Sequence, residues 1–241
     1  MEPDRPSHIL SSAEPFSAKS NIRIQFALES YRRSSEAMKN GFYKDEIVSV
    51  SIPQKRSAPI IIDEDEEPNR ARFEKMPDLR PAFENDGTIT AANASKLNDG
   101  AAIMFITSEE NAKDLGLKPV ARILEQASAS HQPEWFTTAP GKAISKVLNK
   151  AGLKANDIDL WEINEAFSVV AMAAIDDYNI QHEKVNIYGG AVALGHPIGA
   201  SGARILTTLI NGLTRQNVKK GLATLCIGGG EASALIIERY D

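Results

Sequence analysis

The sequence has almost no cysteine, no long apolar run and no excess of basic residues. Its 241 residues include one cysteine, Cys226, which excludes an internal disulfide framework and fits a reducing compartment. We therefore expect a cytoplasmic location, with a mitochondrial one as the alternative. No segment approaches the roughly 18 apolar residues of a membrane helix, and residues 1–20 lack the apolar core of a secretory signal. The net charge of −5 argues against nucleic acid as the main partner.

The composition is that of an ordinary globular protein, with 42% hydrophobic and 24% charged residues. Apolar residues at helical spacing predict a helix over Asn21–Asn40, which Gly41 ends. Ile47–Ile52 is expected to form a short strand. Ser57–Arg80 is polar and acidic, which predicts an exposed segment with little core of its own. Ala101–Ile106 is apolar and strand-like.

Regular alternation of strands and helices begins after Pro119. The expected strands are Val120–Leu124, Asp159–Ile163, Val185–Tyr188, Leu222–Cys226 and Ser233–Glu238, and the expected helices are Ala139–Lys150, Ala166–Tyr178 and Gly202–Leu213. Before Pro119, a capped helix is expected over Glu110–Leu115. Such alternation predicts a layered α/β fold with a largely parallel sheet, in which the last two strands form an antiparallel hairpin.

Three unusual motifs follow predicted strands. They are Asn164-Glu-Ala-Phe, the glycine-rich Gly189-Gly-Ala-Val-Ala-Leu-Gly-His196-Pro-Ile-Gly-Ala-Ser-Gly202, and Cys226-Ile-Gly-Gly-Gly230. Ligands of open α/β sheets bind beyond the carboxyl ends of the strands. We therefore expect an amide, an imidazole and a thiol to meet in one pocket.

Each motif also has a simpler interpretation. Asn164 could cap a helix that begins at Glu165, His196 could be an ordinary loop histidine, and Cys226 could be a small buried apolar residue. The glycines could form tight turns. A dinucleotide cradle is disfavoured, because no Gly-x-Gly-x-x-Gly opens a helix. Coincidence of three such motifs at strand ends favours a shared chemical role.

Side-chain chemistry suggests what that role is. A thiol near an imidazole and near helix N-termini is expected to have a lowered pKa and to exchange protons near neutral pH. His196, together with a water held by Asn164, could donate hydrogen bonds to a developing oxyanion. These groups suit carbonyl chemistry on an acyl group.

The three motifs resemble, in order and spacing, the C-terminal signatures of thiolases. The similarity extends upstream through Phe26-Ala-Leu-Glu-Ser-Tyr, Phe42-Tyr-Lys-Asp-Glu-Ile-Val and Gly87-Thr-Ile-Thr-Ala-Ala-Asn-Ala-Ser, so it covers nearly the whole chain. Within that family the chain looks closest to acetyl-CoA acetyltransferases. The resemblance implies a mixed five-stranded sheet between helices. It also implies three parts: a partial loop domain (1–86), a remnant of the N-terminal domain (87–118) and the C-terminal domain (119–241).

The resemblance implies roles for three catalytic residues. His196 resembles the histidine that activates the nucleophilic cysteine and helps to bind the thioester oxygen. Cys226 resembles the second cysteine, an acid and base that takes a proton from the acetyl-CoA methyl group. Asn164 resembles the residue that fixes the water of an oxyanion hole. The coenzyme A thioester is the substrate, and neither a metal nor a further cofactor is implied.

Four further residues resemble substrate-binding positions of the family. Ser95 matches the serine that hydrogen-bonds the pantetheine arm, and Arg70 matches a basic residue near the coenzyme A nucleotide. Phe136 matches a residue that lines the acyl pocket, and His8 matches a histidine near the pantetheine.

The chain departs from the family pattern because it lacks the segment that should carry the nucleophilic cysteine. We expect it to be incompetent alone, since a covalent acyl intermediate needs that thiol. Four alternatives remain: a split enzyme, a non-catalytic coenzyme A-binding or oligomerising module, a nucleotide-binding dehydrogenase fragment, and an incomplete gene model of an ordinary thiolase. Besides coenzyme A, the expected partner is a second copy of the chain in a homo-oligomer or a complementary N-terminal half. Ala101–Ile106 should expose an apolar edge, because its neighbours in a sheet are missing.

Overall fold

The computed structural model describes residues 16–240, so the prediction for His8 lies outside the described residues. The helices are α2 (Phe16–Lys39), α3 (Glu109–Asp114), α4 (Ala139–Ala151), α5 (Ser168–Tyr178), α6 (Ala191–Leu194) and α7 (Ser201–Gln216). The strands are β1 (Val50–Ile52), β2 (Ile60–Ile62), β3 (Ala121–Ser130), β4 (Leu160–Ile163), β5 (Lys220–Ile227) and β6 (Glu231–Arg239). Short 3-10 helices include η1 (Pro68–Arg70), η2 (Phe73–Asp78) and η3 (Pro133–Thr138). Within this part of the chain, no helix is long and apolar enough to cross a bilayer.

The main sheet has four strands in the order β3-β6-β5-β4. β5 and β6 form the expected antiparallel hairpin, and β4 pairs parallel with β5. β6 lies between β5 and β3 and runs opposite to both. The prediction of a largely parallel sheet was therefore wrong, because one inserted strand makes two of the three pairings antiparallel. β3, β4 and β5 still run in the same direction, so their carboxyl ends share one edge.

The expected fifth strand, Val185–Tyr188, is not formed. Val185 makes only an isolated parallel bridge to Trp161. Asn186 then adopts a left-handed conformation with φ 48°, which ends extended pairing. The Asn186 side chain makes the hydrogen bonds to β4 that a strand backbone would otherwise make. Its Oδ1 accepts from the Ile163 N–H at 2.8 Å, and its Nδ2 donates to the Ile163 carbonyl at 2.9 Å. A side-chain amide thus replaces the ladder that the sequence pattern predicted.

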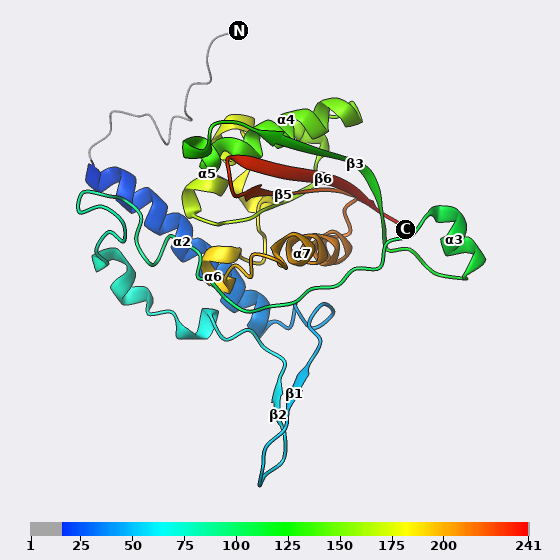
Figure 1. The fold of residues 1–241 in the computed structure, drawn as a ribbon, viewed down its shortest axis with the longest axis horizontal. Helices are drawn as coiled ribbons and strands as arrows, with labels where there is room; N and C mark the ends of the chain where they lie inside the picture. The colour runs from blue at the N-terminus through cyan, green and yellow to red at the C-terminus, as the bar shows by residue number, and fades with distance from the viewer. Residues whose placement is uncertain (1–15, 241) are drawn as a thin grey trace.

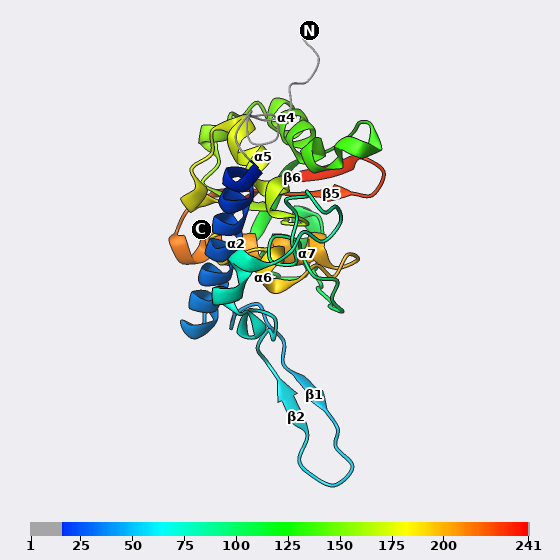
Figure 2. The same ribbon diagram turned by 90° about the vertical axis from the view of Figure 1, so that its left-hand side faces the viewer.

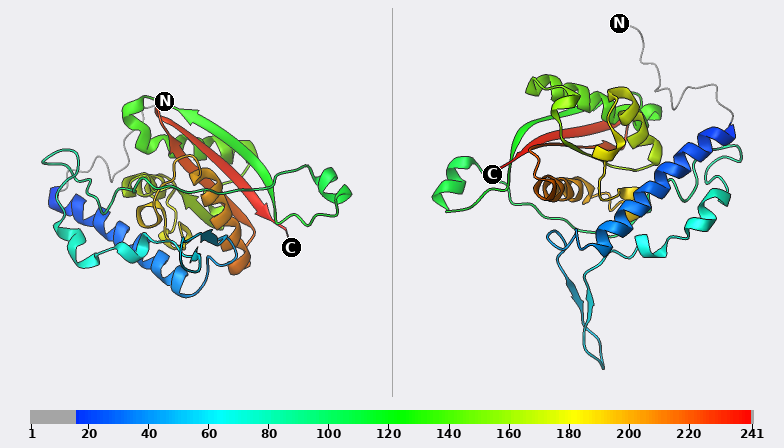
Figure 3. Two further views of the ribbon diagram at one scale, coloured as in Figure 1. Left: turned by 60° about the horizontal axis from the view of Figure 1, so that its bottom comes forward. Right: turned by 180° about the vertical axis from the view of Figure 1, so that it is seen from behind.

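Helices cover both faces of the sheet, as Figure 1 and the views in Figure 3 show. α4 packs on one face and α7 on the other. Strand side chains alternate between faces, and so do neighbours in this sheet: Trp161 and Ile236 join the cluster under α4, whereas Leu160 and Ile237 join the cluster under α7. All four side chains are buried, and burial of each large apolar side chain stabilises the fold by roughly 1.5–3 kcal/mol.

The predicted helices after Pro119 are confirmed, with one shift that concerns the site. α4 ends at Gly152, whose φ of 67° is the left-handed cap that glycine favours. α5 begins at Ser168 with Phe167 as its N-cap residue, two residues later than predicted. Asn164 therefore does not cap a helix that begins at Glu165, and this simpler interpretation was wrong.

The predicted first helix is confirmed, and it begins earlier, at Phe16. Ile24, Ala27 and Tyr31 on one face of α2 join a buried cluster that includes Val192 of α6. Figure 2 shows α2 lying beside α6 and below α5. α2 thus attaches the first part of the chain to the glycine-rich segment that contains His196.

Two apolar segments stand away from the core. β1 and β2 form a hairpin that projects from the molecule (Figure 1), and its side chains are largely exposed. Ala101–Ile106 forms no strand, so that assignment was wrong, although the expected exposure is present: Ile103 is 92% exposed and Phe105 is 78% exposed. A strand needs partners for its backbone, and the segment has none among the described residues. The domain division at residues 86 and 118 stays a prediction.

Candidate active site

Asn164 lies where β4 ends, at the edge of the sheet shared by three strand ends. Its N–H donates to the Thr224 carbonyl of β5 at 3.0 Å, which extends the parallel ladder by one residue. The side chain is 1% exposed, and its Nδ2 lies 3.3 Å from Nε2 of His196. Its Oδ1 is buried without a hydrogen-bond partner in the structure. A buried acceptor of this kind is costly unless a water or ligand satisfies it.

His196 is held at both ring nitrogens. Nδ1 lies 2.6 Å from the Ser201 hydroxyl, which itself donates to the Pro197 carbonyl at 3.1 Å. Because that hydroxyl proton points at Pro197, Ser201 accepts the hydrogen of Nδ1. Nε2 is then the unprotonated nitrogen, and it accepts from the Asn164 amide. Burial, aided by the charge of Arg204, lowers the pKa of His196, so the neutral form with a basic Nε2 prevails at neutral pH.

Ser201 was missed as a functional residue by the sequence analysis. It is the first residue of α7, and its backbone N–H donates to the Pro197 carbonyl at 2.9 Å. The turn between His196 and α7 therefore returns this hydroxyl to the imidazole. A hydroxyl residue at a helix start, five positions after a histidine and four after a proline, was the available signal.

Cys226 lies near the end of β5, the strand next to β4. Thr224, which accepts the Asn164 N–H, is two residues away on the same strand. The thiol is free and half-buried, and burial raises its pKa. The expected lowering was wrong, because the loss of hydration on burial outweighs the backbone hydrogen bond that would lower the pKa of the thiol. The amide and the imidazole are in contact, and the thiol lies near the end of the adjacent strand. A pocket shared by all three groups stays a prediction.

Two glycines allow close backbone contacts around this edge. Gly195, with φ 91°, precedes His196, and a Cβ there would lie 2.1 Å from Oδ1 of Asn98. Gly230, with φ 82°, ends the turn after Cys226, and a Cβ there would lie 2.5 Å from the His131 carbonyl oxygen. Both positions need glycine for conformation and for space.

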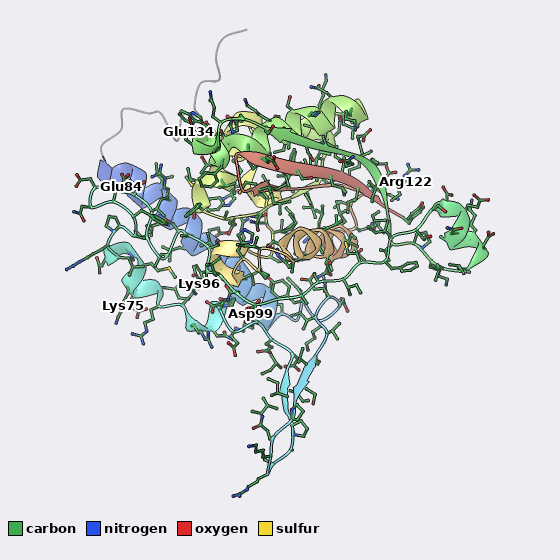
Figure 4. The ribbon with its side chains drawn as sticks, in the orientation of Figure 1. Lys75, Glu84, Lys96, Asp99, Arg122 and Glu134 are labelled. Atoms are coloured by element: carbon green, nitrogen blue, oxygen red, sulfur yellow. The ribbon has the colours of Figure 1, made fainter. Side chains whose placement is uncertain are left out.

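Ser95 and Phe136 are brought to the Asn164-Glu-Ala-Phe motif from distant parts of the chain. Ser95 places its N–H 3.0 Å and its Oγ 2.9 Å from the Ala166 carbonyl oxygen. Phe136 makes an edge contact with Phe167, with ring centroids 6.0 Å apart. Phe136 belongs to η3, which follows β3. Figure 4 labels Arg122 near the start of β3 and Glu134 in η3 at its other end.

Arg70 is not directed at this edge. Its guanidinium pairs with Glu66 at 2.6 Å and with Glu67 at 3.3 Å, and its side chain is largely exposed. Glu67 also pairs with Lys96, whose carbonyl accepts the His196 N–H at 2.8 Å. Arg70 is thus connected to the His196 segment only through Glu67 and Lys96. A phosphate would have to compete with the carboxylates of Glu66 and Glu67 for the Arg70 guanidinium.

Glu162 gives a pH-dependent test of the core beside the site. Its buried carboxyl lies 3.3 Å from Nη1 of Arg204, yet burial raises its pKa to about 8. A carboxyl with a raised folded pKa contributes stability below its unfolded pKa and loses it as pH rises through the folded value. From pH 5 to pH 8 the wild-type free energy of unfolding should therefore fall by about 1 kcal/mol per unit relative to Glu162→Gln. Urea unfolding at several pH values measures this difference, and a constant difference would contradict it.

Two family models match consecutive parts of the chain. The model described as "Thiolase, C-terminal domain" matches residues 117–239, and the one described as "Thiolase, N-terminal domain" matches residues 11–110. The chain belongs to the thiolase family. The α/β fold with a mixed sheet, expected from the resemblance, is the fold of its structural neighbours as well.

Thiolases of known sequence and structure resemble the chain over most of its length. A probable acetyl-CoA acetyltransferase of Dictyostelium discoideum is 52% identical over 215 residues, which cover 89% of this chain and 52% of the relative. The mitochondrial acetyl-CoA acetyltransferase of Mus musculus is 48% identical, with coverage of 96% and 55%. This thiolase chain therefore spans about half the length of these relatives.

Solved thiolase structures give the same result. The acetyl-CoA acetyltransferase of Bacillus anthracis superposes with a TM-score of 0.87 at 42% identity, covering 90% of this chain and 55% of that one. The Acat5 thiolase of Ascaris suum, solved in complex with coenzyme A, gives 0.81 at 43% identity, covering 92% and 56%.

Proposed function

We propose that this chain supplies the C-terminal catalytic groups of an acetyl-CoA acetyltransferase. The reaction joins two acetyl-CoA molecules into acetoacetyl-CoA and coenzyme A, or runs in the thiolytic direction. The observation that carries the proposal is the contact between the Asn164 amide and the His196 imidazole, beside the strand that carries Cys226.

His196 acts first in this proposal. Its unprotonated Nε2 takes the proton of a nucleophilic cysteine on a complementary segment, and that sulfur attacks the acetyl carbonyl carbon. The bond between the acetyl carbon and the coenzyme A sulfur breaks, leaving an acyl-enzyme thioester. The lowered pKa of His196 supports this role, because it keeps Nε2 available at neutral pH.

Cys226 follows as an acid and then as a base. A thiol with a raised pKa begins protonated, so it gives its proton to the departing coenzyme A thiolate. The Cys226 thiolate then removes a methyl proton from the second acetyl-CoA. The carbanion attacks the acyl-enzyme, and the released cysteine sulfur recovers its proton from His196. Protons and bonds balance over the cycle.

Asn164 and the residues around it complete the site. The buried, unpaired Oδ1 of Asn164 supports a bound water that donates to the thioester oxygen. Ser95 donates its hydroxyl proton to the Ala166 carbonyl, so it faces the pantetheine as an acceptor for an amide N–H. Phe136, packed on Phe167, lines the acyl pocket. By the resemblance alone, Arg70 is assigned to the coenzyme A nucleotide and His8 to the pantetheine.

A second polypeptide segment is part of the proposal, because the reaction needs a second thiol and these 241 residues contain one cysteine. The exposed apolar side chains of Ile103, Phe105 and Ile106 support a docking face for that segment. Ile103, Leu194 and Pro197 line one cavity of about 620 Å³. Phe105 and Ile106 line a second one, of about 950 Å³. A complementary N-terminal half of a thiolase is the partner we propose, with homo-oligomers forming around it.

Reconstitution tests the function. The 241-residue chain is mixed with the part of the Dictyostelium discoideum relative that it does not match, and cleavage of acetoacetyl-CoA by coenzyme A is followed. We expect activity only in the mixture. Activity of the chain alone would refute the need for a second thiol, and an inactive but stable complex would refute the catalytic proposal.

Phe105→Asp tests the docking face in the same experiment. A buried unpaired carboxylate costs several kcal/mol, so we expect at least a hundredfold weaker assembly, measured by titration calorimetry. Asn149→Asp is the matched control, since Asn149 is exposed on α4 at the other face of the sheet. Equal affinity of the two variants would contradict the proposed face.

A non-catalytic coenzyme A-binding module is the second candidate, favoured by the presence of one thiol in the sequence. It predicts that the isolated chain binds coenzyme A with an affinity that Cys226→Ala leaves unchanged, and that no mixture gains activity. A calorimetric titration without heat of binding excludes it.

The compartment is also a proposal. We place the chain in the cytoplasm, with mitochondria as the alternative. Among its relatives, the Mus musculus enzyme is named mitochondrial and the Gibberella zeae enzyme is named cytosolic. Fractionation of cells that express the native gene decides between the two locations.

A further inference from the structure

Glu165 is a buried carboxylate that the mechanism above does not use. The residue is 1% exposed and lies between β4 and α5. Oε2 accepts from the Ser30 hydroxyl at 2.7 Å and from the Val192 N–H at 3.2 Å, and Oε1 accepts from Nδ2 of Asn186 at 2.8 Å. The Glu165 side chain thus connects three parts of the molecule. It contacts α2 through Ser30, the segment in place of the fifth strand through Asn186, and α6 through Val192.

Every partner of Glu165 is fixed as a donor. The Ser30 Oγ accepts from the Gly190 N–H at 2.9 Å, so its own proton is directed to the carboxylate. Asn186 is oriented by its two bonds to the backbone of Ile163, so its amide nitrogen is the group that faces Glu165. A backbone N–H, that of Val192, only donates. The three donors therefore favour the ionised carboxylate, which accepts on both oxygens, and they oppose the rise in the pKa of Glu165 that its burial causes.

The backbone that Glu165 holds leads directly to His196. A Cβ at Gly190 would lie 2.3 Å from the carboxyl carbon of Glu165, so the chain approaches closely at this point. From Val192 the four-residue α6 runs to Gly195, whose N–H donates to the Ala191 carbonyl at 2.8 Å. The next N–H, that of His196, donates to the Lys96 carbonyl at 2.8 Å. The segment is pinned at both ends.

We propose that Glu165, as a carboxylate, is a positioning residue that locks Gly190–Leu194 onto α2 and thereby sets the place of the His196 ring. The catalytic part of this inference rests on the proposed function, whereas the structural part does not. Glu165→Gln has nearly the same shape but places an amide N–H₂ against a donor. Either Asn186 or Val192 then loses its acceptor, and an unsatisfied buried donor costs about 1–3 kcal/mol.

NMR of the 241-residue chain tests the structural part without any activity. In Glu165→Gln we expect about tenfold or faster hydrogen exchange at the Gly190 and Val192 amides and a moved or broadened His196 Hε1 signal. Ser30→Ala should produce the same changes to a smaller extent, and it serves if Glu165→Gln does not fold. Glu162→Gln, at the other buried carboxyl, which lies on β4, is the matched control and should leave the exchange of the Gly190 and Val192 amides in place.

Unchanged exchange and an unchanged His196 signal in Glu165→Gln, or an equal response in Glu162→Gln, overturn the proposal.

The reconstituted enzyme tests the catalytic part. There Glu165→Gln should lower kcat about tenfold or more, corresponding to a loss of one hydrogen bond to a charged group, while KM for coenzyme A changes less than about twofold. If wild-type mixtures are inactive, the proposed function fails but the NMR result still decides whether Glu165 positions His196. An altered KM with unchanged kcat overturns the assignment to His196.

Discussion

His196→Ala is expected to lower kcat of the reconstituted enzyme by about 10²- to 10⁴-fold, the range for loss of a positioned general base. Ser201 and Asn164 hold the imidazole with Nε2 unprotonated, so this nitrogen accepts the thiol proton in place of the hydrogen bond from the Asn164 amide. Without the imidazole, the nucleophilic thiol keeps its proton, and thioester formation becomes rate-limiting. A stopped-flow measurement of acyl-enzyme formation from acetyl-CoA separates this step from carbon–carbon bond formation.

The pH dependence of acyl-enzyme formation tests whether His196 is the general base. Burial and Arg204 lower the pKa of His196, so the acidic limb of kcat/KM should lie below the value of about 6.5 for free imidazole. Ser201→Ala is the control for orientation, and it should reduce the rate less than His196→Ala does. Retention of wild-type acylation in His196→Ala would assign the base elsewhere.

Apart from the strand expected over Val185–Tyr188, the elements predicted after Pro119 are present, because their residues follow the period of a strand or a helix. The site could be predicted for a related reason. Adjacent strands that run in one direction end at one edge, so Asn164 and Cys226 had to be neighbours once β4 and β5 were paired. The contact with His196 followed from the position of its motif after the next strand-like segment.

Features that depend on partners distant in the sequence could not be predicted. Nothing local shows that the Asn186 side chain replaces a strand ladder, or that Ser30 on α2 provides a donor to Glu165. The exposed Ala101–Ile106 segment has the pattern of a strand, but a strand forms only with a neighbour. Likewise, the pKa of the Cys226 thiol depends on how far the folded chain buries it, which a sequence does not reveal.

Cys226→Ala is the second variant for which we expect a large effect. It should lower kcat for condensation by about 10²- to 10⁴-fold through loss of the acid and base, while the affinity for coenzyme A is retained. Cys226→Ser keeps the size and a hydroxyl proton but is a much weaker acid. It should therefore resemble Cys226→Ala in rate rather than the wild type.

Hydrogen exchange at the substrate locates the defect. In D₂O the assembled wild-type enzyme should introduce deuterium into the methyl group of acetyl-CoA, because the Cys226 thiolate removes that proton reversibly. Cys226→Ala should lose this exchange while acylation of the nucleophilic cysteine continues. If exchange persists, the base is a group other than Cys226, and the raised pKa of Cys226 then reflects a thiol that stays protonated throughout the cycle. Thiol alkylation as a function of pH distinguishes these cases independently, because only the thiolate reacts.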